Sequence, residues 1–405
     1  MKRNFSAEQR MVSIVRCNGN VEDAVVKAVK LLGGMDRVVK PGEKVLLKPN
    51  LGHPKHYTTG ATTNPEVTKA LVKLCYEAGA KKVYVAESPS WGYDVKEVFQ
   101  ITEIESVREA GGELVSLDET PFQEVEIPGA RYLRKVRVAR LPFECDKVIN
   151  IPVMKTHMQT TVSLSLKNLK GLLPGKEKVK LHMVRTDDPS MPGLDIAIAE
   201  YNTVVPCHFN VMDGTVGMEG PGPADGEPVN MGLILAGFNR VAVDAVTSAV
   251  MGFNPQEINH IRFASELGVG PLHLEELEVR GLRVEEVLRR FKPAPTVPEV
   301  GPNIKILKGK ACSGCLGTLS TAVYRMAKAS EISKVPELYI LVGLDVKPPE
   351  GAERVLTIGN CAFKKGYPHV EGCPPTGWEI VKGIRQFIAE KKPSTYKSRV
   401  VDQDS

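Results

Sequence analysis

The sequence has few aromatic residues, no strong charge of either sign and no long apolar run. Aromatic residues make up 6% of its 405 residues, and the net charge at pH 7 is +5. Nucleic-acid-binding surfaces combine a strongly basic patch with stacking aromatics, so this composition argues against a nucleic-acid partner. No stretch reaches the roughly 18 apolar residues of a membrane-spanning helix. The N-terminus also lacks the apolar segment of a secretion signal. We therefore expect a soluble cytoplasmic protein with no membrane partner.

Two other features are missing. No G-x-G-x-x-G motif joins a strand to a helix, so the sequence predicts no flavin or NAD site. Disulfides are rare in the cytosol, so the eight cysteines need another explanation. Four are scattered among apolar residues and are expected to be small buried hydrophobes: Cys17, Cys75, Cys145 and Cys207. The other four lie in the last quarter of the chain: Cys312, Cys315, Cys361 and Cys373.

Strand-like and helix-like segments alternate through the first three quarters of the chain. Residues 11–17 and 44–50 are expected to be strands. Residues 20–34 and 64–80 are expected to be helices that begin at Asn20 and Asn64. Residues 145–157 are expected to form one strand, 95–112 a helix, and 207–220 a strand followed by a glycine-rich loop. This alternation predicts an α/β domain with a mainly parallel sheet over residues 1–291.

A proline-rich segment divides the chain. Residues 292–303, KPAPTVPEVGPN, hold four prolines and are expected to be a linker. Residues 304–392 again alternate strand and helix and predict a small α/β module, and residues 393–405 form a polar, loose tail.

The small module contains the four clustered cysteines. Cys312 and Cys315 form a C-x-x-C pair that places two thiolates on one tight loop, whereas Cys361 and Cys373 are single and each follows a Gly-containing turn. Four thiolates suit either zinc or an iron–sulfur cluster. Structural zinc sites usually pair two C-x-x-C turns, so the spacing favours a cluster. Zinc, and thiols without any metal, remain alternatives.

Polar residues follow three strands of the larger domain. Ligands in open α/β sheets bind outside the carboxyl ends of the strands. Lysines and glycine-rich loops there point to a small anionic substrate. We expect His157 and Lys155 to act in acid–base steps. The expected substrate-binding residues are Lys48, Asn50, Thr156, Lys167, Asn168, Lys170, Asp213 and Glu219.

Four of these residues also have an ordinary explanation. His157 fits a hydrogen-bonded loop, the lysines at 167 and 170 a solvated helix face, and Asp213 a tight turn. Asp244 lies in an apolar run, either near the site or as a satisfied core carboxylate. His53 and His56 could ligate a metal, although loop histidines seldom do.

The segments ACSGC, IGNCA and EGCPPTG together resemble those that hold the proximal 4Fe–4S cluster in nickel–iron hydrogenase small subunits and in the related subunit of respiratory complex I. The resemblance implies that Cys312, Cys315, Cys361 and Cys373 are the four ligands of one 4Fe–4S cluster. A cluster held by four cysteines has no open iron for substrate, so it would transfer electrons or serve a structural role.

The larger domain has a resemblance of its own. The segments LLKPNL, TTNPEVTKALV, INIPVMKTHMQTTVSLSLKNLKG and VMDGTVGMEGPGP are similar, over about residues 44–272, to the domain-of-unknown-function 362 family. That resemblance implies a fold distantly related to the catalytic domain of lactate racemase, together with the position of a site, but no reaction.

Three functions follow as hypotheses. The first is an iron–sulfur redox enzyme or electron-transfer protein that acts on a small anionic ligand or an electron-transfer partner. The second is a non-enzymatic cluster carrier or redox sensor. The third is a racemase or isomerase of the lactate-racemase type. The sequence leaves open whether the chain forms a homo-oligomer.

Overall fold

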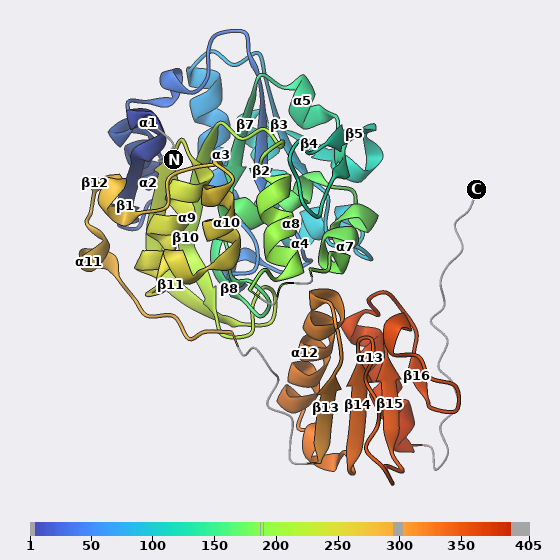
Figure 1. The fold of residues 1–405 in the computed structure, drawn as a ribbon. Coiled ribbons are helices and arrows are strands. Elements are labelled where there is room, and N and C mark those ends of the chain that lie inside the picture. Colours follow the sequence, from blue (N-terminus) through green and yellow to red (C-terminus); the bar gives the residue numbers. More distant parts are fainter. Residues whose placement is uncertain (1–4, 187, 189, 295–302, 390–405) are drawn as a thin grey trace. The chain divides into compact units, whose positions relative to one another are not determined.

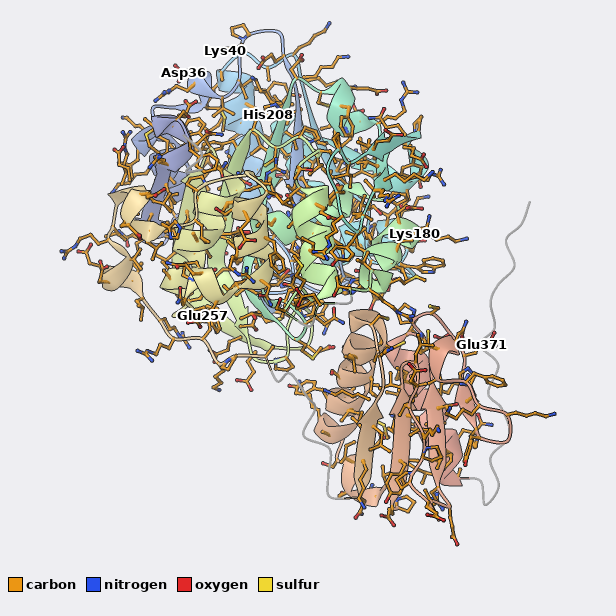
Figure 2. All side chains as sticks on the ribbon, viewed as in Figure 1. Asp36, Lys40, Lys180, His208, Glu257 and Glu371 are labelled. Atoms are coloured by element: carbon orange, nitrogen blue, oxygen red, sulfur yellow. The ribbon has the colours of Figure 1, made fainter. Side chains whose placement is uncertain are left out.

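The computed structural model describes residues 5–186, 188, 190–294 and 303–389. The chain divides into two compact units, Met1–Ala294 and Pro295–Ser405. Most of the predicted linker and all of the predicted tail lie outside the described residues. No helix in the described residues is long and apolar enough to cross a membrane. Charged side chains project outward from both units, among them Lys40, Lys180 and Glu371 (Figure 2).

The N-terminal unit is built on a ten-stranded sheet whose main path runs β12-β1-β11-β10-β7-β2-β3-β4, with β8 pairing β10 and β9. Its strands are β1 Met11–Arg16, β2 Lys44–Pro49, β3 Lys82–Glu87, β4 Glu113–Ser116, β7 Lys147–Ile151, β8 Val153–His157, β9 Thr161–Ser163, β10 Phe209–Glu219, β11 Glu227–Gly237 and β12 Glu278–Gly281; a separate hairpin joins β5 Phe122–Glu126 to β6 Lys135–Ala139.

The helices of this unit cover both faces of the sheet (Figure 1). They are α1 Ala7–Arg10, α2 Val21–Leu31, α3 Pro65–Glu77, α4 Val95–Ile101, α5 Leu141–Glu144, α6 Ser165–Asn168, α7 Gly175–Met183, α8 Gly193–Tyr201, α9 Arg240–Val250, α10 Asn259–Glu266 and α11 Val284–Val287. Short 3-10 helices include η2 Tyr57–Thr59, η3 Ile104–Ala110, η4 Leu117–Glu119 and η5 Leu169–Leu172.

Side-chain alternation along β2 explains the two hydrophobic layers. Val45 and Leu47 pack into the core beneath α2 and α3. Leu46 packs into the opposite core, beneath α8, α9 and α10. Successive strand residues point to opposite faces, so a buried central strand must be apolar on both.

The predicted α/β class is confirmed. Strands β10, β7, β2, β3 and β4 are mutually parallel. The predicted helix starts are also confirmed, because the side chains of Asn20 and Asn64 cap the N-termini of α2 and α3.

Three details of the predicted secondary structure were wrong. The expected single strand is two, β7 and β8, separated by Pro152, which lacks the N–H that a continuous ladder needs. The expected helix over 95–112 divides into α4 and η3 at Glu103, whose φ of 58° is left-handed. The expected glycine-rich loop after Asp213 is instead part of β10, which pairs antiparallel with β11 and has a bulge between Gly214 and Val216.

The C-terminal unit is a four-stranded parallel sheet in the order β13-β14-β15-β16. Its elements are β13 Ile304–Lys308, α12 Ser313–Lys328, β14 Leu338–Val342, β15 Val355–Ile358, η9 Asn360–Ala362, β16 His369–Val370 and α13 Gly377–Ala389. The helices α12 and α13 pack with the strands around one apolar core. The unit therefore forms the predicted small α/β fold, with a short fourth strand, β16, that the sequence did not indicate.

Candidate functional site

A buried ion pair lies at the carboxyl edge of the large sheet, between the ends of β2 and β3. Lys48 Nζ is 2.8 Å from Glu87 Oε2, and both side chains are almost inaccessible to solvent. The Glu87 carboxylate also accepts the backbone N–H groups of Leu51 at 2.9 Å and Ser88 at 3.0 Å. A Cβ at Gly171 would overlap both charged groups, so only glycine fits beside the pair. The pair thus fixes the chain where it leaves two neighbouring strands.

Asparagine side chains connect this ion pair to Lys155. Asn168 Oδ1 lies 3.5 Å from Lys48 Nζ and accepts the side-chain amide of Asn50 at 2.8 Å. Lys155 Nζ donates to Asn50 Oδ1 at 3.0 Å. Asn168 also donates to Asn150 Oδ1 at 2.8 Å. Four of the predicted site residues therefore form one hydrogen-bonded set: Lys48 of β2, Asn50 just after it, Lys155 of β8 and Asn168 of α6.

Lys155 belongs as well to a concentration of basic side chains that we call the cationic cluster: Lys155, His157, Lys167, Lys170 and His182. Lys170 Nζ lies 2.8 Å from His182 Nε2. Burial lowers the pKa of Lys167 well below its ordinary value, and the charges of Lys170 and Lys155 lower it further. Burial also lowers the pKa of His182 well below its ordinary value, and the charges of Lys170 and Lys167 lower it further. The predicted site lysines are thus close enough to repel one another.

The lysines of the cationic cluster are not neutralised by the protein. Burial lowers the pKa of Lys155 to about 7, despite the attraction of Glu87. Burial, and to a smaller extent the charge of Lys178, lowers the pKa of Lys170 to about 7. Within the described part of the chain, neither lysine has a carboxylate within ion-pair distance, and the same holds for Lys167. An anion bound there would supply the missing negative charge.

His157, at the end of β8, is held in one tautomer. Its Nδ1 accepts the backbone N–H of Gln159 at 3.0 Å. Burial and the nearby charges of Lys167 and His182 place its pKa well below the ordinary value. A neutral ring that accepts at Nδ1 carries its proton on Nε2. His157 therefore presents a neutral N–H donor from Nε2.

Asp244 positions the helix that carries two of the site residues. Its carboxylate accepts the backbone N–H groups of Ser165 at 2.7 Å and Leu166 at 2.9 Å, at the start of α6. Burial raises the pKa of Asp244 to about 6. Lys167 and Asn168 follow in the same short helix. Of the two explanations the sequence left open, the satisfied carboxylate describes Asp244, and it orients α6.

Asp213 has contacts that stabilise the fold. Its Oδ2 accepts the backbone N–H of Asn64 at 2.7 Å, and its Oδ1 accepts the N–H and hydroxyl of Thr215 at 2.9 and 2.7 Å. The carboxylate therefore anchors the start of α3, and we assign it no ligand.

Glu219 and Thr156, also predicted to bind substrate, face the backbone. Glu219 Oε2 accepts the N–H of Lys292 at 3.0 Å. Thr156 Oγ1 donates to the carbonyl of Gly220 at 2.8 Å. Glu219 Oε1 also lies 3.7 Å from Lys292 Nζ, so both side chains stabilise the end of β10.

The two loop histidines have different surroundings. Burial and the charge of Lys155 lower the pKa of His53 to about 3, so its ring borders the cationic cluster. His56 instead contacts Glu103, with Nε2 3.3 Å from the carboxylate. In the described residues no group of three or more His, Cys, Asp or Glu side chains is arranged to hold a metal ion.

Sequence reasoning missed three residues of this site: Glu87, Lys178 and His182. Lys178 Nζ donates to the carbonyls of Ser88 and Pro89, the latter at 2.7 Å. Burial lowers the pKa of Lys178 to about 8. Glu87 could have been found as a charged residue that ends an apolar strand. The two residues on α7 lie in a segment whose sequence has no clear apolar periodicity.

In the C-terminal unit, the four clustered cysteines follow three strands of the parallel sheet. Cys312 is the N-cap of α12 and Cys315 lies in its first turn, both after β13. Cys361 lies in η9, after β15, and Cys373 follows β16. The first two are buried, at 8% and 5% exposure, whereas the last two are partly exposed. Parallel strands share a carboxyl edge, so the four thiols collect at one edge.

The four thiols lie close enough to influence one another. The pKa of Cys315 is raised by its hydrogen bond with Cys312, by burial, and by the nearby charges of Cys373 and Cys361. A Cβ at Gly359 would lie 2.6 Å from the Cys315 sulfur, so this position needs glycine. Gly359 also has a φ of 81°, which favours glycine.

No disulfide joins any of the eight cysteines. Burial raises the pKa of Cys17 to about 11 and of Cys145 to about 12. Cys75 and Cys207 also have raised pKa values because of burial. These four thiols remain protonated at neutral pH. Cys75 and Cys145 are buried as predicted, whereas Cys17 and Cys207 are partly exposed, so the predicted burial was wrong for these two.

Comparison with known proteins identifies the family. The thylakoid-associated protein sll1697 of Synechocystis sp. is 30% identical over 298 residues, which cover 69% of this chain and 89% of that protein. The lactate racemase apoprotein of Thermoanaerobacterium thermosaccharolyticum is 11% identical with a TM-score of 0.40, over 84% of this chain and 71% of that one. At this level the structural likeness supports no argument about the reaction. The model of the domain of unknown function DUF362 matches residues 45–249. The chain therefore belongs to the DUF362 family.

Proposed function

We propose that the C-terminal unit binds one 4Fe–4S cluster through Cys312, Cys315, Cys361 and Cys373. We further propose that the protein is a redox enzyme or electron-transfer protein that acts on a small anionic ligand at the cationic cluster. The observation that carries the proposal is the convergence of four thiols from three strand ends, where all three neighbours raise the pKa of Cys315. When bound, such a cluster would supply one-electron transfer.

The residues around the thiols fit this group. Cys312 and Cys315 lie at the N-terminus of a 16-residue helix, where the helix dipole favours thiolates. Four thiolates this close together repel one another, so they are stable only around positive charge, which the irons would provide. Gly359 and Gly372 bring backbone close to the set without side chains; at Gly372 the φ is 144° and a Cβ would lie 2.5 Å from Pro375 Cα.

The order of the cysteines along the chain favours a cluster over zinc. Structural zinc sites usually combine two C-x-x-C turns, whereas here one such pair, Cys312 and Cys315, is joined by two single cysteines, Cys361 and Cys373. Single cysteines at separate strand ends suit a cluster, whose irons and sulfides lie between its ligands. Anaerobic purification with iron, sulfide and zinc quantified together tests the choice. About four irons per chain support the proposal, whereas stoichiometric zinc in a colourless protein contradicts it.

The cationic cluster supports the second half of the proposal. Lys155, Lys167 and Lys170 would hold an anion, and the Nε2–H of His157 would donate to it. Lys155 and Lys170, with pKa values near 7, can exchange a proton at neutral pH. The chain's own residues would thus bind the ligand and move protons, while electrons come from the other unit or a partner.

Anion binding should depend on pH. Groups with a pKa of about 7, such as Lys155 and Lys170, are mostly protonated at pH 6 and mostly neutral at pH 8. Binding stabilises the protonated form, so affinity falls as pH rises through this window. We expect the dissociation constant for sulfate, whose charge is fixed over this range, to rise about tenfold for each lysine that must be charged.

Calorimetric titration of sulfate at several pH values checks this result. Lys170→Met should weaken binding at pH 6 and flatten its pH profile. Lys96→Met, at an exposed position on α4, is the matched control and should leave the profile unchanged. An affinity that is constant from pH 6 to 8 in the unmodified protein would contradict the role given to these lysines.

A further inference from the structure

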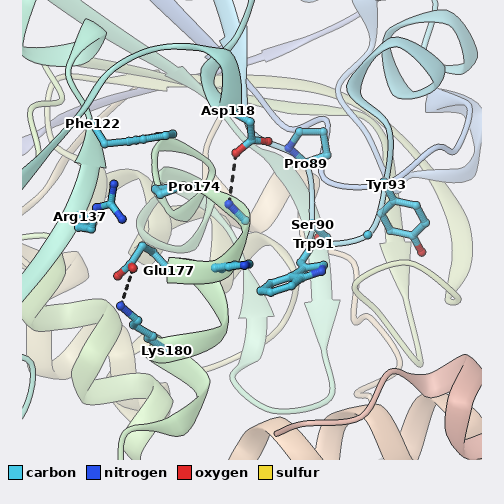
Figure 3. Close-up of a pocket in the computed structure, with 13 residues that line it drawn as sticks. Pro89, Ser90, Trp91, Tyr93, Asp118, Phe122, Arg137, Pro174, Glu177 and Lys180 are labelled. Atoms are coloured by element: carbon cyan, nitrogen blue, oxygen red, sulfur yellow. Dashed lines mark hydrogen bonds and ion pairs between the residues drawn. The ribbon is translucent and has the colours of Figure 1, made fainter. Parts of the chain in front are cut away.

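A cavity lies outside the cationic cluster, where the chain leaves β3 and β4. Its volume is about 490 Å³, within the range of small-molecule sites. Four chain segments line it: the loop after β3, η4, the β5–β6 hairpin and the start of α7 (Figure 3). None of the residues predicted from the sequence to form the site lines this cavity.

Aromatic side chains form part of its wall. Trp91 is 51% exposed and Tyr93 is 39% exposed, although both are large and apolar. Phe122, from the hairpin, lies on the side of the cavity opposite Trp91 in Figure 3. Exposed aromatic faces in a hollow provide flat surfaces on which a planar ring can stack.

Two cations of the cavity have no carboxylate partner in the part of the chain that the structure describes: Arg137 and Lys176. The Arg137 guanidinium lies 5.7 Å from the centre of the Phe122 ring, and Lys176 Nζ lies 5.3 Å from that of Trp91. Each basic group is therefore already placed beside an aromatic surface.

The lining is basic on balance. Glu177 pairs with Lys180 at 2.6 Å. Asp118 keeps its charge, but its Oδ1 is occupied by the Ser88 hydroxyl at 2.8 Å and the backbone N–H of Gly175 at 3.2 Å. The basic groups left without a carboxylate partner in the described residues are Arg137 and Lys176, so the lining is basic by one charge, three basic side chains against two acidic ones.

We propose that this cavity binds a planar aromatic anion, whose ring stacks on Trp91 and whose carboxylate or phosphate is attracted by Arg137 and Lys176. Aromatic walls select the ring, and the two cations select its negative charge. A nucleotide and an aromatic carboxylate share this chemistry. The site does not depend on the cysteines, so its test is independent of metal content.

The two tryptophans of the chain make the test direct. Trp378 lies in the other unit, so a Trp378→Phe protein reports on Trp91 alone. In that background we would titrate AMP and 2-naphthoate, with adenosine and inorganic phosphate as probes that lack the charge or the ring. Fluorescence follows Trp91, and calorimetry gives the stoichiometry.

We expect saturable binding of AMP, of 2-naphthoate or of both, and the one that binds identifies the source of the ligand. Arg137→Ala and Lys176→Ala should each raise the dissociation constant about tenfold. Arg16→Ala, at an exposed position on β1, is the control and should have no effect. The proposal is overturned if neither compound binds at millimolar concentration, if adenosine binds as tightly as AMP, or if Arg137→Ala binds like the control.

Discussion

On the proposed ligand set, replacing Cys373 by serine is expected to remove most of the bound iron and sulfide. Serine has nearly the same size, so the turn after β16 can keep its shape, but its hydroxyl is a poor ligand at neutral pH. Iron content should fall from about four atoms per chain to a small fraction of that value. The brown colour and its bleaching by dithionite should be lost together.

The matched control is Cys207→Ser. Cys207 is also partly exposed, and it lies in the other unit, where its thiol contacts Asn210. This variant should retain the full metal content. Circular dichroism of both variants would separate ligand loss from unfolding. A folded Cys373→Ser protein that keeps its iron and sulfide would break the assignment of this ligand.

Replacing Glu87 by alanine is expected to destabilise the N-terminal unit by about 3–5 kcal/mol, because one partner of a buried ion pair is removed. The change leaves the Lys48 ammonium without its counter-charge, the N–H of Leu51 loses its acceptor, and the N–H of Ser88 keeps only the Gly171 carbonyl at 3.1 Å. Urea unfolding followed by Trp91 fluorescence, in the Trp378→Phe background, would measure the loss. Gly171→Ala should lower the midpoint in the same direction, by forcing the pair apart.

Two comparisons make this prediction specific. Glu109→Ala breaks the exposed pair with Lys69 and should leave the unfolding midpoint unchanged within error. Glu87→Gln combined with Lys48→Met removes both charges and keeps one side-chain acceptor for the Leu51 N–H, while the Ser88 N–H keeps the Gly171 carbonyl, so it should recover much of the lost stability. A Glu87→Ala protein as stable as the Glu109→Ala protein would show that the buried pair does not hold the two strand ends together.

Local signals predicted much of the N-terminal fold. Buried strands such as β2 and β3 are short apolar runs that end at charged residues, and Asn20 and Asn64 mark helix starts. The antiparallel pairing of β10 with β11 was not predictable in this way. Its glycines, including Gly214 and Gly217, resemble a loop in sequence, and only the pairing with β11 makes that segment a strand.

Residues of the candidate site could be predicted where polar side chains lie at the carboxyl end of a strand. Lys48, Asn50 and Lys155 were predicted for this reason, and the structure joins them, through Asn168, by hydrogen bonds. Lys178 and His182 were missed because α7 is short and its partners lie far away in sequence. Contacts such as Lys178 to Ser88, across 90 positions, leave no local signature.

The unequal exposure of the four thiols has a consequence for how such a centre would communicate with its surroundings. Cys312 and Cys315 are shielded by the core of the C-terminal unit, whereas Cys361 and Cys373 are partly open to solvent. Electron tunnelling is fastest where the least protein intervenes. A redox partner would therefore bind beside Cys361 and Cys373. Dissolved oxygen would arrive by the same route. A partner bound at this exposed side would therefore receive electrons from the cluster and would also shield the cluster from oxygen.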